Sequence, residues 1–579
     1  HFSPAPEQRE SPKRARCPAP GKNESAVRYF MSDNGKVVII GLDGATFRVL
    51  RPLVEAGVMP TVGRFMSEGA WGNLLSTRPP VTCPAWPTMY TGVGRGKHGV
   101  FSFSHRDVVT GRVRTAAITD VRVPKLWDLV GDANCRSAIL NVPITFPAQR
   151  IDGVMLTGFV SPDDSPHVTY PPSLASELRE AFGELKLNWS VLGFRPADKA
   201  KREEHVRTIN KLMALRIAQF EHILDGNPCD LCYLVHEYPD RVYHLYHHIL
   251  DPAYPAHRDP ENASTLAMLH EGHRTVDDSI KRLMERFGPQ ANYVIVSDHG
   301  FGGVTKWVYL NNLLEGSGLV KFRTGRVWAE LISRQMNLSV KMRQRLGVES
   351  KELWHRQDPS CAPLIDYRHS RAFAGPQLEQ AVYVNLKGRF PDGIVEQADY
   401  ERVRGEIIDV LTNAMDPDTG SPIFQGVWSR DELFPGPYLE NAPDVIYELS
   451  PGYMVSNSIL PKAVLKGGCL RPLKSGWDIS GYHRPEGVFL GLGPAFARVS
   501  GFEASILDIT PTVLYLMNLP IPDYMNGDVI RPAIKPGLLN GRAQRTSHVA
   551  PESFGRAQSP YSEKEQLEVT RRLEELGYL

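Results

Sequence analysis

Short runs of consecutive apolar residues recur along this chain and predict strands that are buried on both faces of a sheet. Apolar residues at helical spacing lie between these runs, for example over 206–224 and 271–287. The alternation of the two patterns predicts an α/β fold with a doubly wound, mostly parallel sheet flanked by helices. The predicted strands are 36–42, 137–140, 231–235, 293–296 and 488–492.

Two stretches interrupt this alternation and are expected to be insertions. Residues 145–200 contain many Pro, Asp and Ser residues and predict a loop-rich cap. Residues 320–420 carry two amphipathic stretches, 327–346 and 400–413, and predict a second small lobe. A chain of 579 residues exceeds one hydrophobic core, so insertions of this size are expected.

The two ends of the chain differ in composition from the predicted core over 36–535. Residues 1–35 are rich in Pro and charge, and we expect a disordered leader there. Residues 536–579 form a polar tail in which Ser562 and Glu565 predict a capping box. The helix that follows is expected to dock onto the body through one face, formed by Leu567, Thr570, Leu573 and Leu576.

Charge and cysteine content exclude several functional classes. The net charge is +1, from 66 basic and 65 acidic residues, which gives no electrostatic case for nucleic acid or an anionic membrane as partner. No apolar stretch approaches the roughly 18 residues needed to span a bilayer. Seven scattered cysteines, an odd number, indicate reduced thiols and a cytoplasmic setting. The lone pair Cys229 and Cys232 predicts buried core thiols, because two ligands cannot complete a tetrahedral metal site.

Candidate catalytic residues lie at the ends of the predicted strands. Asp43 directly follows the first strand, where doubly wound sheets bind their ligands. Thr82 is expected to be the N-cap of a helix that has Pro84 in its first turn and ends at Gly92. A hydroxyl at this position feels the positive end of the helix dipole, which stabilises an alkoxide and an approaching phosphate.

Further metal-ligand candidates follow three other strands. Asp240 and His244 are four residues apart, which places both on one face of a helix. His247 and His248 follow them and are expected at the surface. The pair Asp298–His299 closes the strand 293–296, and Gly300 is expected to break that strand so that both side chains reach one metal. His483 lies in a predicted loop before the last strand, and imidazole is a good ligand for borderline metals.

With these residues in place, the chain resembles the alkaline phosphatase superfamily. It is most similar to the type I phosphodiesterase/nucleotide pyrophosphatase branch and to predicted phosphohydrolase/phosphomutase proteins of prokaryotes. The resemblance covers about 36–535. Its matching stretches are GLDGAT at 41–46, VTCPAWPTMYTG and KHGV within 81–100, DRVYH at 240–244, SDHGF at 297–301 and SGYHRPEGVF at 480–489.

The resemblance implies an alkaline phosphatase-like core that holds two divalent cations, zinc most often, with manganese or another divalent ion as the alternative. Cations roughly 4 Å apart would clamp the attacking and leaving oxygens, and the Thr82 hydroxyl would form a phosphothreonine. The implied ligands are Asp240, His244 and His483 for one cation, and Asp43, Asp298 and His299, with Thr82 facing them, for the other.

We therefore expect a metal-dependent phosphohydrolase of the phosphodiesterase type that acts on a small phosphate ester. Lys97, Lys306 and Arg484 are candidates for binding the phosphoryl charge. A phosphomutase or phosphomonoesterase of the same superfamily remains open, as does a non-catalytic scaffold that binds phosphorylated ligands. The sequence disfavours a sulfatase, because Cys83 is followed directly by Pro84 and no Arg lies four residues further on.

Overall fold

The computed structural model describes most of the chain from Gly35 onward. The described residues are 35–106, 113–183, 185, 187, 198–323, 325, 327–328, 364–375, 379–439, 441–473, 479–539, 545–546 and 559–575. The predicted leader, apart from Gly35, and nearly all of the amphipathic stretch 327–346 lie outside these residues.

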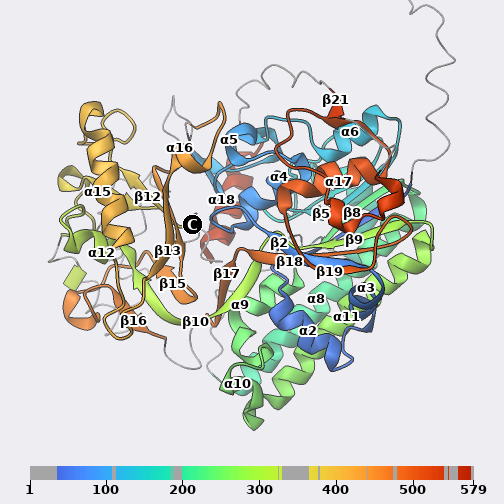
Figure 1. Ribbon diagram of the computed structural model, residues 1–579, viewed down its shortest axis with the longest axis horizontal. Coiled ribbons are helices and arrows are strands. Elements are labelled where there is room, and N and C mark those ends of the chain that lie inside the picture. Colours follow the sequence, from blue (N-terminus) through green and yellow to red (C-terminus); the bar gives the residue numbers. More distant parts are fainter. Residues whose placement is uncertain are drawn as a thin grey trace, which may run out of the picture. The chain divides into compact units, whose positions relative to one another are not determined.

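A nine-stranded sheet forms the centre of the fold, and all five predicted strands belong to it (Figure 1). Strand β1 lies in its middle, parallel to β8 on one side and to β9 on the other. Only β7 and β18 run antiparallel to the remaining seven strands, which confirms the mostly parallel sheet. In spatial order the strands are β19 (Val499–Ser505), β2 (Ala70–Leu75), β18 (Glu486–Leu492), β9 (Asn292–Val296), β1 (Val37–Leu42), β8 (Leu231–His236), β5 (Ser137–Val142), β6 (Gly153–Thr157) and β7 (Thr169–Tyr170).

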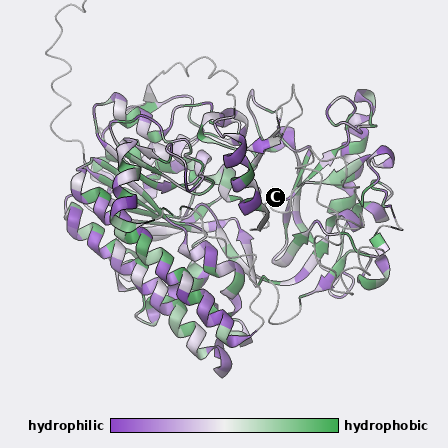
Figure 2. Cartoon of the chain, turned by 180° about the vertical axis from the view of Figure 1, so that it is seen from behind, coloured by the Kyte–Doolittle hydropathy of each residue, from purple (hydrophilic) through white to green (hydrophobic). Residues whose placement is uncertain are grey.

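Helices cover both faces of this sheet, as a doubly wound fold requires. Figure 1 shows α8 and α11 on one side and α4, α6 and α17 on the other. The two predicted helices 206–224 and 271–287 are confirmed as the interiors of α8 and α11. Figure 2 shows hydrophilic residues along the outer faces of these long helices. The helices of the core are α2 (Phe47–Glu55), α3 (Pro60–Glu68), α4 (Thr82–Thr91), α5 (Arg95–His98), α6 (Leu126–Asp132), α7 (Ser173–Phe182), α8 (Lys199–Gly226), α9 (Tyr238–Leu250), α10 (Pro255–Arg258), α11 (Ala263–Phe287) and α17 (Ile509–Leu516).

The segment 145–200 is more than the predicted loop-rich cap. It supplies β6 and β7, which complete one edge of the central sheet, and then helix α7. Strand β6 was missed because its GVMLT run follows Pro- and Asp-containing loops closely. Residues 184, 186 and 188–197 of this segment lie outside the described part of the chain.

A second sheet forms the predicted lobe, but the lobe extends beyond residue 420. Its four strands are ordered β11-β12-β14-β13, and the last two lie after the predicted boundary. Helix α15 packs on this sheet and confirms the amphipathic stretch 400–413. A smaller sheet centred on β10 follows β14. The elements are β11 (Ala372–Ala374), β12 (Ala381–Val384), α15 (Tyr400–Thr412), β13 (Phe424–Ser429), α16 (Arg430–Leu433), β14 (Val445–Leu449), β15 (Gly452–Ser456), β16 (Leu470–Pro472), β10 (Gly300–Tyr309), α12 (Leu310–Gly316) and β17 (Gly481–Arg484).

The tail carries helix α18 (Glu563–Glu575), which packs against strand β4 (Val113–Thr115), the partner of β3 (Ser104–Arg106). Ser562 and Glu565 form the expected reciprocal hydrogen bonds at its start. The buried face is formed by Val569 and Leu573. Leu567 was wrongly assigned to that face and is 72% exposed, because one-position errors in helical phase turn a side chain by about 100°.

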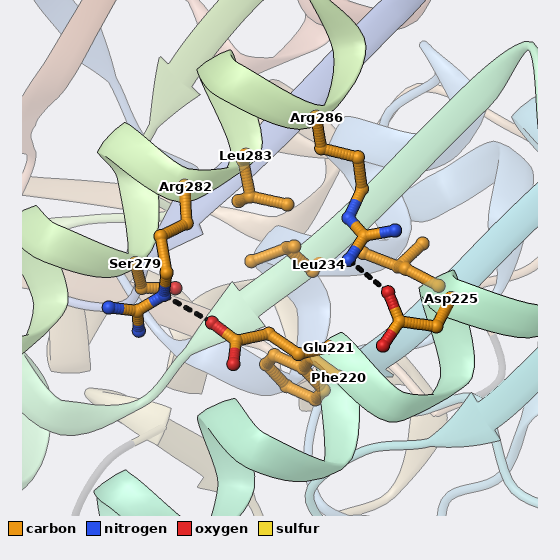
Figure 3. A pocket seen from close by; sticks show the side chains of 9 residues that line it. Phe220, Glu221, Asp225, Leu234, Ser279, Arg282, Leu283 and Arg286 are labelled. Atoms are coloured by element: carbon orange, nitrogen blue, oxygen red, sulfur yellow. Dashed lines mark hydrogen bonds and ion pairs between the residues drawn. The ribbon is translucent and has the colours of Figure 1, made fainter.

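One cavity of about 170 Å³ lies between α8 and α11, over β8 (Figure 3). Apolar side chains such as Phe220 and Leu283 line it, and the ion pairs Glu221–Arg282 and Asp225–Arg286 flank it. In the described part of the chain, no helix combines the length and the apolar content needed to cross a membrane.

Candidate metal centre and nucleophile

The chain brings the predicted site residues together at the carboxyl ends of the central strands. Asp43 follows β1, Asp240 lies in the first turn of α9 after β8, and Asp298 and His299 connect β9 to β10. His483 lies in β17 rather than in the expected loop, and pairs with Phe301 of β10. All seven residues are at most 3% exposed, namely Asp43, Thr82, Asp240, His244, Asp298, His299 and His483.

Two glycines allow these backbones to approach closely. Gly44 has a φ of +69°, which favours glycine, and its N–H donates to Asp298 Oδ1 at 3.2 Å. Gly300 acts differently from the prediction: it begins β10, and a Cβ there would lie 1.9 Å from the Glu486 carbonyl oxygen. Gly300 is therefore required by a close strand contact.

The first group of metal-ligand atoms consists of Asp240, His244 and His483. Their nearest atoms lie within 4.8 Å of one another. Asp240 Oδ1 is 3.3 Å from both His244 Nε2 and His483 Nε2, and these two nitrogens are 3.0 Å apart. The spacing of four residues on α9 thus presents Asp240 and His244 to one point, as predicted.

The second group consists of Asp43, Asp240 and His299, again within 4.8 Å of one another. His299 Nε2 lies 3.7 Å from Asp43 Oδ1 and 3.3 Å from Asp298 Oδ2. Asp298 therefore lies beside this group, and Asp240 belongs to both groups. This sharing was not predicted, because the sequence places Asp240 beside His244 only.

Thr82 is the first residue of α4, and Val81 is the N-cap, so the predicted cap is displaced by one position. The Thr82 hydroxyl lies 3.1 Å from His299 Nε2. Helix α4 ends at Gly92, whose φ of +69° gives the expected left-handed C-cap. The hydroxyl is therefore held at a helix N-terminus and against the second group.

The backbone fixes the protonation pattern of two of the histidines. His299 Nδ1 lies 3.2 Å from the Gly300 carbonyl, and His483 Nδ1 lies 3.0 Å from the Pro80 carbonyl. Because carbonyls accept only, both Nδ1 atoms carry the proton, and both Nε2 atoms present lone pairs to the site. The Thr82 hydroxyl accordingly donates to His299 Nε2.

The carboxylates of the site carry opposite pKa shifts. Burial, together with the charges of Asp298 and Asp240, raises the pKa of Asp43 well above its ordinary value. Burial and Asp240 raise the pKa of Asp298 to about 7. Burial also acts on Asp240, but its two histidine neighbours outweigh it and lower the pKa of Asp240. Burial lowers the pKa of His299 and His244.

These residues fit divalent cations. The atoms Asp43 Oδ1, Asp240 Oδ1, Asp298 Oδ2 and His244 Nδ1 are buried without a hydrogen-bond partner among the described residues. Three carboxylates with like charges crowd together, and the Nε2 atoms of His244 and His483 lie 3.0 Å apart. Such a donor set is costly when empty and is typical of a site for cations bound by nitrogen and oxygen.

Trp86 is a further residue of the site that the sequence analysis missed. It lies one helical turn after Thr82 on α4, and its indole N–H donates to Asp43 Oδ2 at 3.3 Å. Its ring is fully buried against Gly41 of β1, where a Cβ would lie 2.6 Å from the indole. Trp86 thereby links α4, the helix that begins at Thr82, to a candidate metal ligand.

Arg241 is a buried cation beside the candidate ligand Asp240. Its Nη1 lies 3.8 Å from Asp240 Oδ2, and its Nη2 donates to Glu237 Oε2 at 3.2 Å. The Glu237 carboxylate also accepts from Asn141, to which Arg216 donates in turn. Arg241 acts electrostatically to lower the pKa of Asp43. The sequence analysis did not single out Arg241, although its position directly after Asp240 indicated a place near the site.

The three predicted phosphoryl-binding cations have other partners in the structure. Lys97 donates to the Tyr524 carbonyl, and Lys306 forms ion pairs with Asp416 and Asp418. Arg484 is buried and donates to the carbonyls of Leu449 and Tyr453, on the neighbouring lobe strands. No contact of these cations among the described residues reaches the seven-residue cluster.

The expected surface position of His247 is wrong. Its side chain is fully buried, and its Nε2 lies 3.4 Å from Asp251 Oδ2. It lies one turn after His244 on the inward face of α9, where Gly481 of β17 packs against its Cβ. The cysteines of the described residues are buried and form no disulfide bond with one another, and Cys229 and Cys232 are buried thiols, as predicted.

The chain is similar to several known proteins. A family model described as type I phosphodiesterase / nucleotide pyrophosphatase matches residues 37–478. Solved structures that are similar include human ectonucleotide pyrophosphatase / phosphodiesterase 5, at 14% identity and a TM-score of 0.46. An inactive form of the murine protein in complex with AMP matches at 14% identity and a TM-score of 0.45. Each match covers 86% of this chain and 100% of the other chain.

No curated protein matches the chain. The family match covers about three quarters of the 579 residues, including every candidate ligand except His483. The chain therefore belongs to the type I phosphodiesterase / nucleotide pyrophosphatase family, whose members are metal-dependent phosphoric ester hydrolases.

Proposed function

We propose that this protein is a two-metal phosphodiesterase that acts through a covalent phosphothreonine at Thr82. The observation that carries the proposal is the position of the Thr82 hydroxyl, 3.1 Å from His299 Nε2 and at the first turn of α4. Its helix end and its neighbouring ligand set are the two features that activate a hydroxyl for attack on phosphorus.

The six candidate ligands would hold the two cations in the groups that they form. Asp240, His244 and His483 would hold one, and Asp43, Asp298 and His299 the other, with Asp240 able to contact both. Nitrogen and carboxylate donors suit zinc, with manganese as the alternative. When bound, the cations supply a lowered pKa for the hydroxyl and neutralise charge on the phosphoryl group.

The proposed reaction has two steps, and both take place at Thr82. The Thr82 oxygen attacks phosphorus, the bond to one ester oxygen breaks, and the first alcohol leaves with a proton. Water then attacks the phosphothreonine, which releases a phosphate monoester and restores the Thr82 hydroxyl. Thr82 is the first residue of α4, where the positive end of the helix dipole would stabilise the oxygen that becomes negative. His299 and His483 are held in one tautomer by the Gly300 and Pro80 carbonyls.

A diester is favoured over a monoester because the guanidinium closest to Thr82 in sequence, that of Arg95, is already engaged. Its Nη2 donates to the Thr77 hydroxyl at 2.6 Å and to the Pro79 carbonyl. A monoester carries one more negative charge and requires a further cation to offset it. Lys97, Lys306 and Arg484 have the partners described above and do not provide it.

The test is hydrolysis of bis-(p-nitrophenyl) phosphate by protein supplied with zinc or manganese. We expect turnover that disappears in Thr82→Ala, while metal content stays unchanged. Thr91→Ala is the matched control, because Thr91 is also buried on α4 but its hydroxyl donates to the Pro87 carbonyl within the helix. Full activity in Thr82→Ala would overturn the covalent mechanism, and no turnover with either metal would overturn the diesterase assignment.

A further inference from the structure

The ring of Phe301 lies among the three candidate histidine ligands, and none of the steps above uses it. Phe301 is 2% exposed and follows Gly300 at the start of β10. The centre of its ring lies 4.8 Å from that of His244, 5.1 Å from that of His483 and 5.7 Å from that of His299. These histidines come from α9, from β17 and from the link between β9 and β10. One side chain therefore contacts ligands from three parts of the chain.

The backbone leaves room for the Phe301 ring on two sides. A Cβ at Gly44 would lie 2.6 Å from Phe301 Cε2, and a Cβ at Gly481 would lie 3.1 Å from Phe301 Cδ1. Phe301 also pairs with His483 across β10 and β17. The ring is therefore held closely by the elements that carry the candidate ligands.

The three histidines differ at the ring nitrogen that faces away from the site. In a metal-bound histidine this outer nitrogen usually donates to an oxygen atom, which fixes the ring orientation and tunes metal affinity. The outer Nδ1 atoms of His299 and His483 donate to backbone carbonyls. His244 turns its Nε2 toward Asp240 and His483, so its outer nitrogen is also Nδ1. This Nδ1 atom is buried, and it has no hydrogen-bond partner within the described part of the chain.

The His244 ring is packed against the Phe301 ring instead. The two rings lie at 83° to each other, the perpendicular arrangement that aromatic pairs favour. A second ring beside His244 is that of His483, 4.9 Å away, and it also lies against Phe301. Because protein interiors are close-packed, rings at these distances restrict the rotation of the His244 side chain. The contact with Phe301 therefore helps to hold His244 Nε2 toward the first group.

We propose that Phe301 is a positioning residue for the first group, in which it orients His244 in place of a hydrogen-bond acceptor. A phenyl ring supplies no ligand atom, so Phe301 acts through His244. In the second group His299 keeps its carbonyl partner, and that group depends on Phe301 much less. The inference rests on the proposed function, because it takes Asp240, His244 and His483 to hold one of the two cations.

The test measures the zinc affinity of each group separately in the whole chain, by chelator competition. Asp298→Asn removes a candidate ligand of the second cation and leaves the first group intact, whereas His244→Ala does the reverse. In the Asp298→Asn background, Phe301→Leu should raise the zinc dissociation constant about tenfold, the lower end of the 10–100-fold range for partners of metal ligands. In the His244→Ala background, Phe301→Leu should leave the constant nearly unchanged. Phe301→Met, whose flexible side chain fills irregular space, takes the place of Phe301→Leu if that variant does not fold.

The matched control is Phe489→Leu in the Asp298→Asn background. Phe489 is also fully buried, in β18 of the central sheet, and its ring lies against those of Phe496 and Phe502. The control removes the same ring from the core and should leave the zinc dissociation constant unchanged. An equal rise in the control, or equal rises of the Phe301→Leu constant in both backgrounds, would overturn the positioning role, because lost core packing would then explain the effect. An unchanged constant in Phe301→Leu would also overturn it.

If the Asp298→Asn protein binds no zinc, the two-metal function fails, and NMR of the metal-free protein with isotope-labelled histidine tests the role of Phe301 separately. The ring signals of His244 are identified by their absence in His244→Ala. One sharp set in the unaltered protein, with several or broadened sets in Phe301→Leu, would support the positioning role. The same signals in both proteins, or several sets in the unaltered protein, would overturn it.

Discussion

Replacing Trp86 by Phe tests whether α4, which carries the proposed nucleophile Thr82, also sets metal affinity. The substitution removes the indole N–H that donates to Asp43 Oδ2 at 3.3 Å and keeps an aromatic ring against Gly41. A hydrogen bond to a charged group contributes roughly 1.5–3 kcal/mol, and the 3.3 Å length places this bond at the weaker end. An energy of about 1.4 kcal/mol corresponds to a factor of ten in affinity.

We therefore expect the zinc dissociation constant of the weaker of the two sites to rise by about 10-fold, within the range of 10–100-fold seen for partners of metal ligands. Chelator competition measures the constant directly, without turnover. Trp127→Phe is the control, because Trp127 is equally buried but donates to Gln149. An unchanged zinc dissociation constant in Trp86→Phe, with a normal value in the control, would refute the coupling of α4 to the metal centre through Asp43.

Three further predictions concern ligands, the buried ion pair and pH. Asp298→Asn should lower bound metal from about two ions per chain toward one, measured by elemental analysis, because a ligand is removed. Arg241→Gln should destabilise folding by about 3–5 kcal/mol in urea titration, since Glu237 is left buried without its cation, and adding Glu237→Gln should recover part of the loss. Burial and Arg95 lower the pKa of His98 to about 3, so folded His98 stays neutral. Its stabilisation is complete above pH 6.5 and is lost as pH falls toward 3, by about 1.4 kcal/mol per pH unit, a slope that should be absent in His98→Gln.

The strands and the positions of the candidate ligands were predictable because local sequence determines both. A continuous apolar run such as that of β1 predicts a strand buried on both faces, because it has no polar positions to face solvent. A residue directly after such a run must lie at the end of the strand. The positions of Asp43 and of the pair Asp298–His299 were predicted in this way, because each directly follows such a strand. Asp240 and His244 needed only the helical spacing of four residues.

Positions that depend on tertiary contacts were not predictable in the same way. Arg484 alternates with His483 along β17, and its neighbours on the lobe strands are far away in sequence. In the sequence, Trp86 cannot be distinguished from an ordinary core residue, because its hydrogen bond to Asp43 forms only when α4 packs against β1. The lobe extends beyond residue 420 because β13 and β14 pair with each other, and β14 pairs with β12, rather than with the central sheet.

The central claim is that Thr82 carries the phosphoryl group during turnover. Acid quenching of zinc-supplied protein with bis-(p-nitrophenyl) phosphate, followed by mass spectrometry of the peptide that contains residues 79–95, tests it most directly. The account predicts a phosphate ester on Thr82 in the unaltered protein and none in Thr82→Ala. A phosphorylated residue elsewhere, or continued turnover by Thr82→Ala, would contradict it.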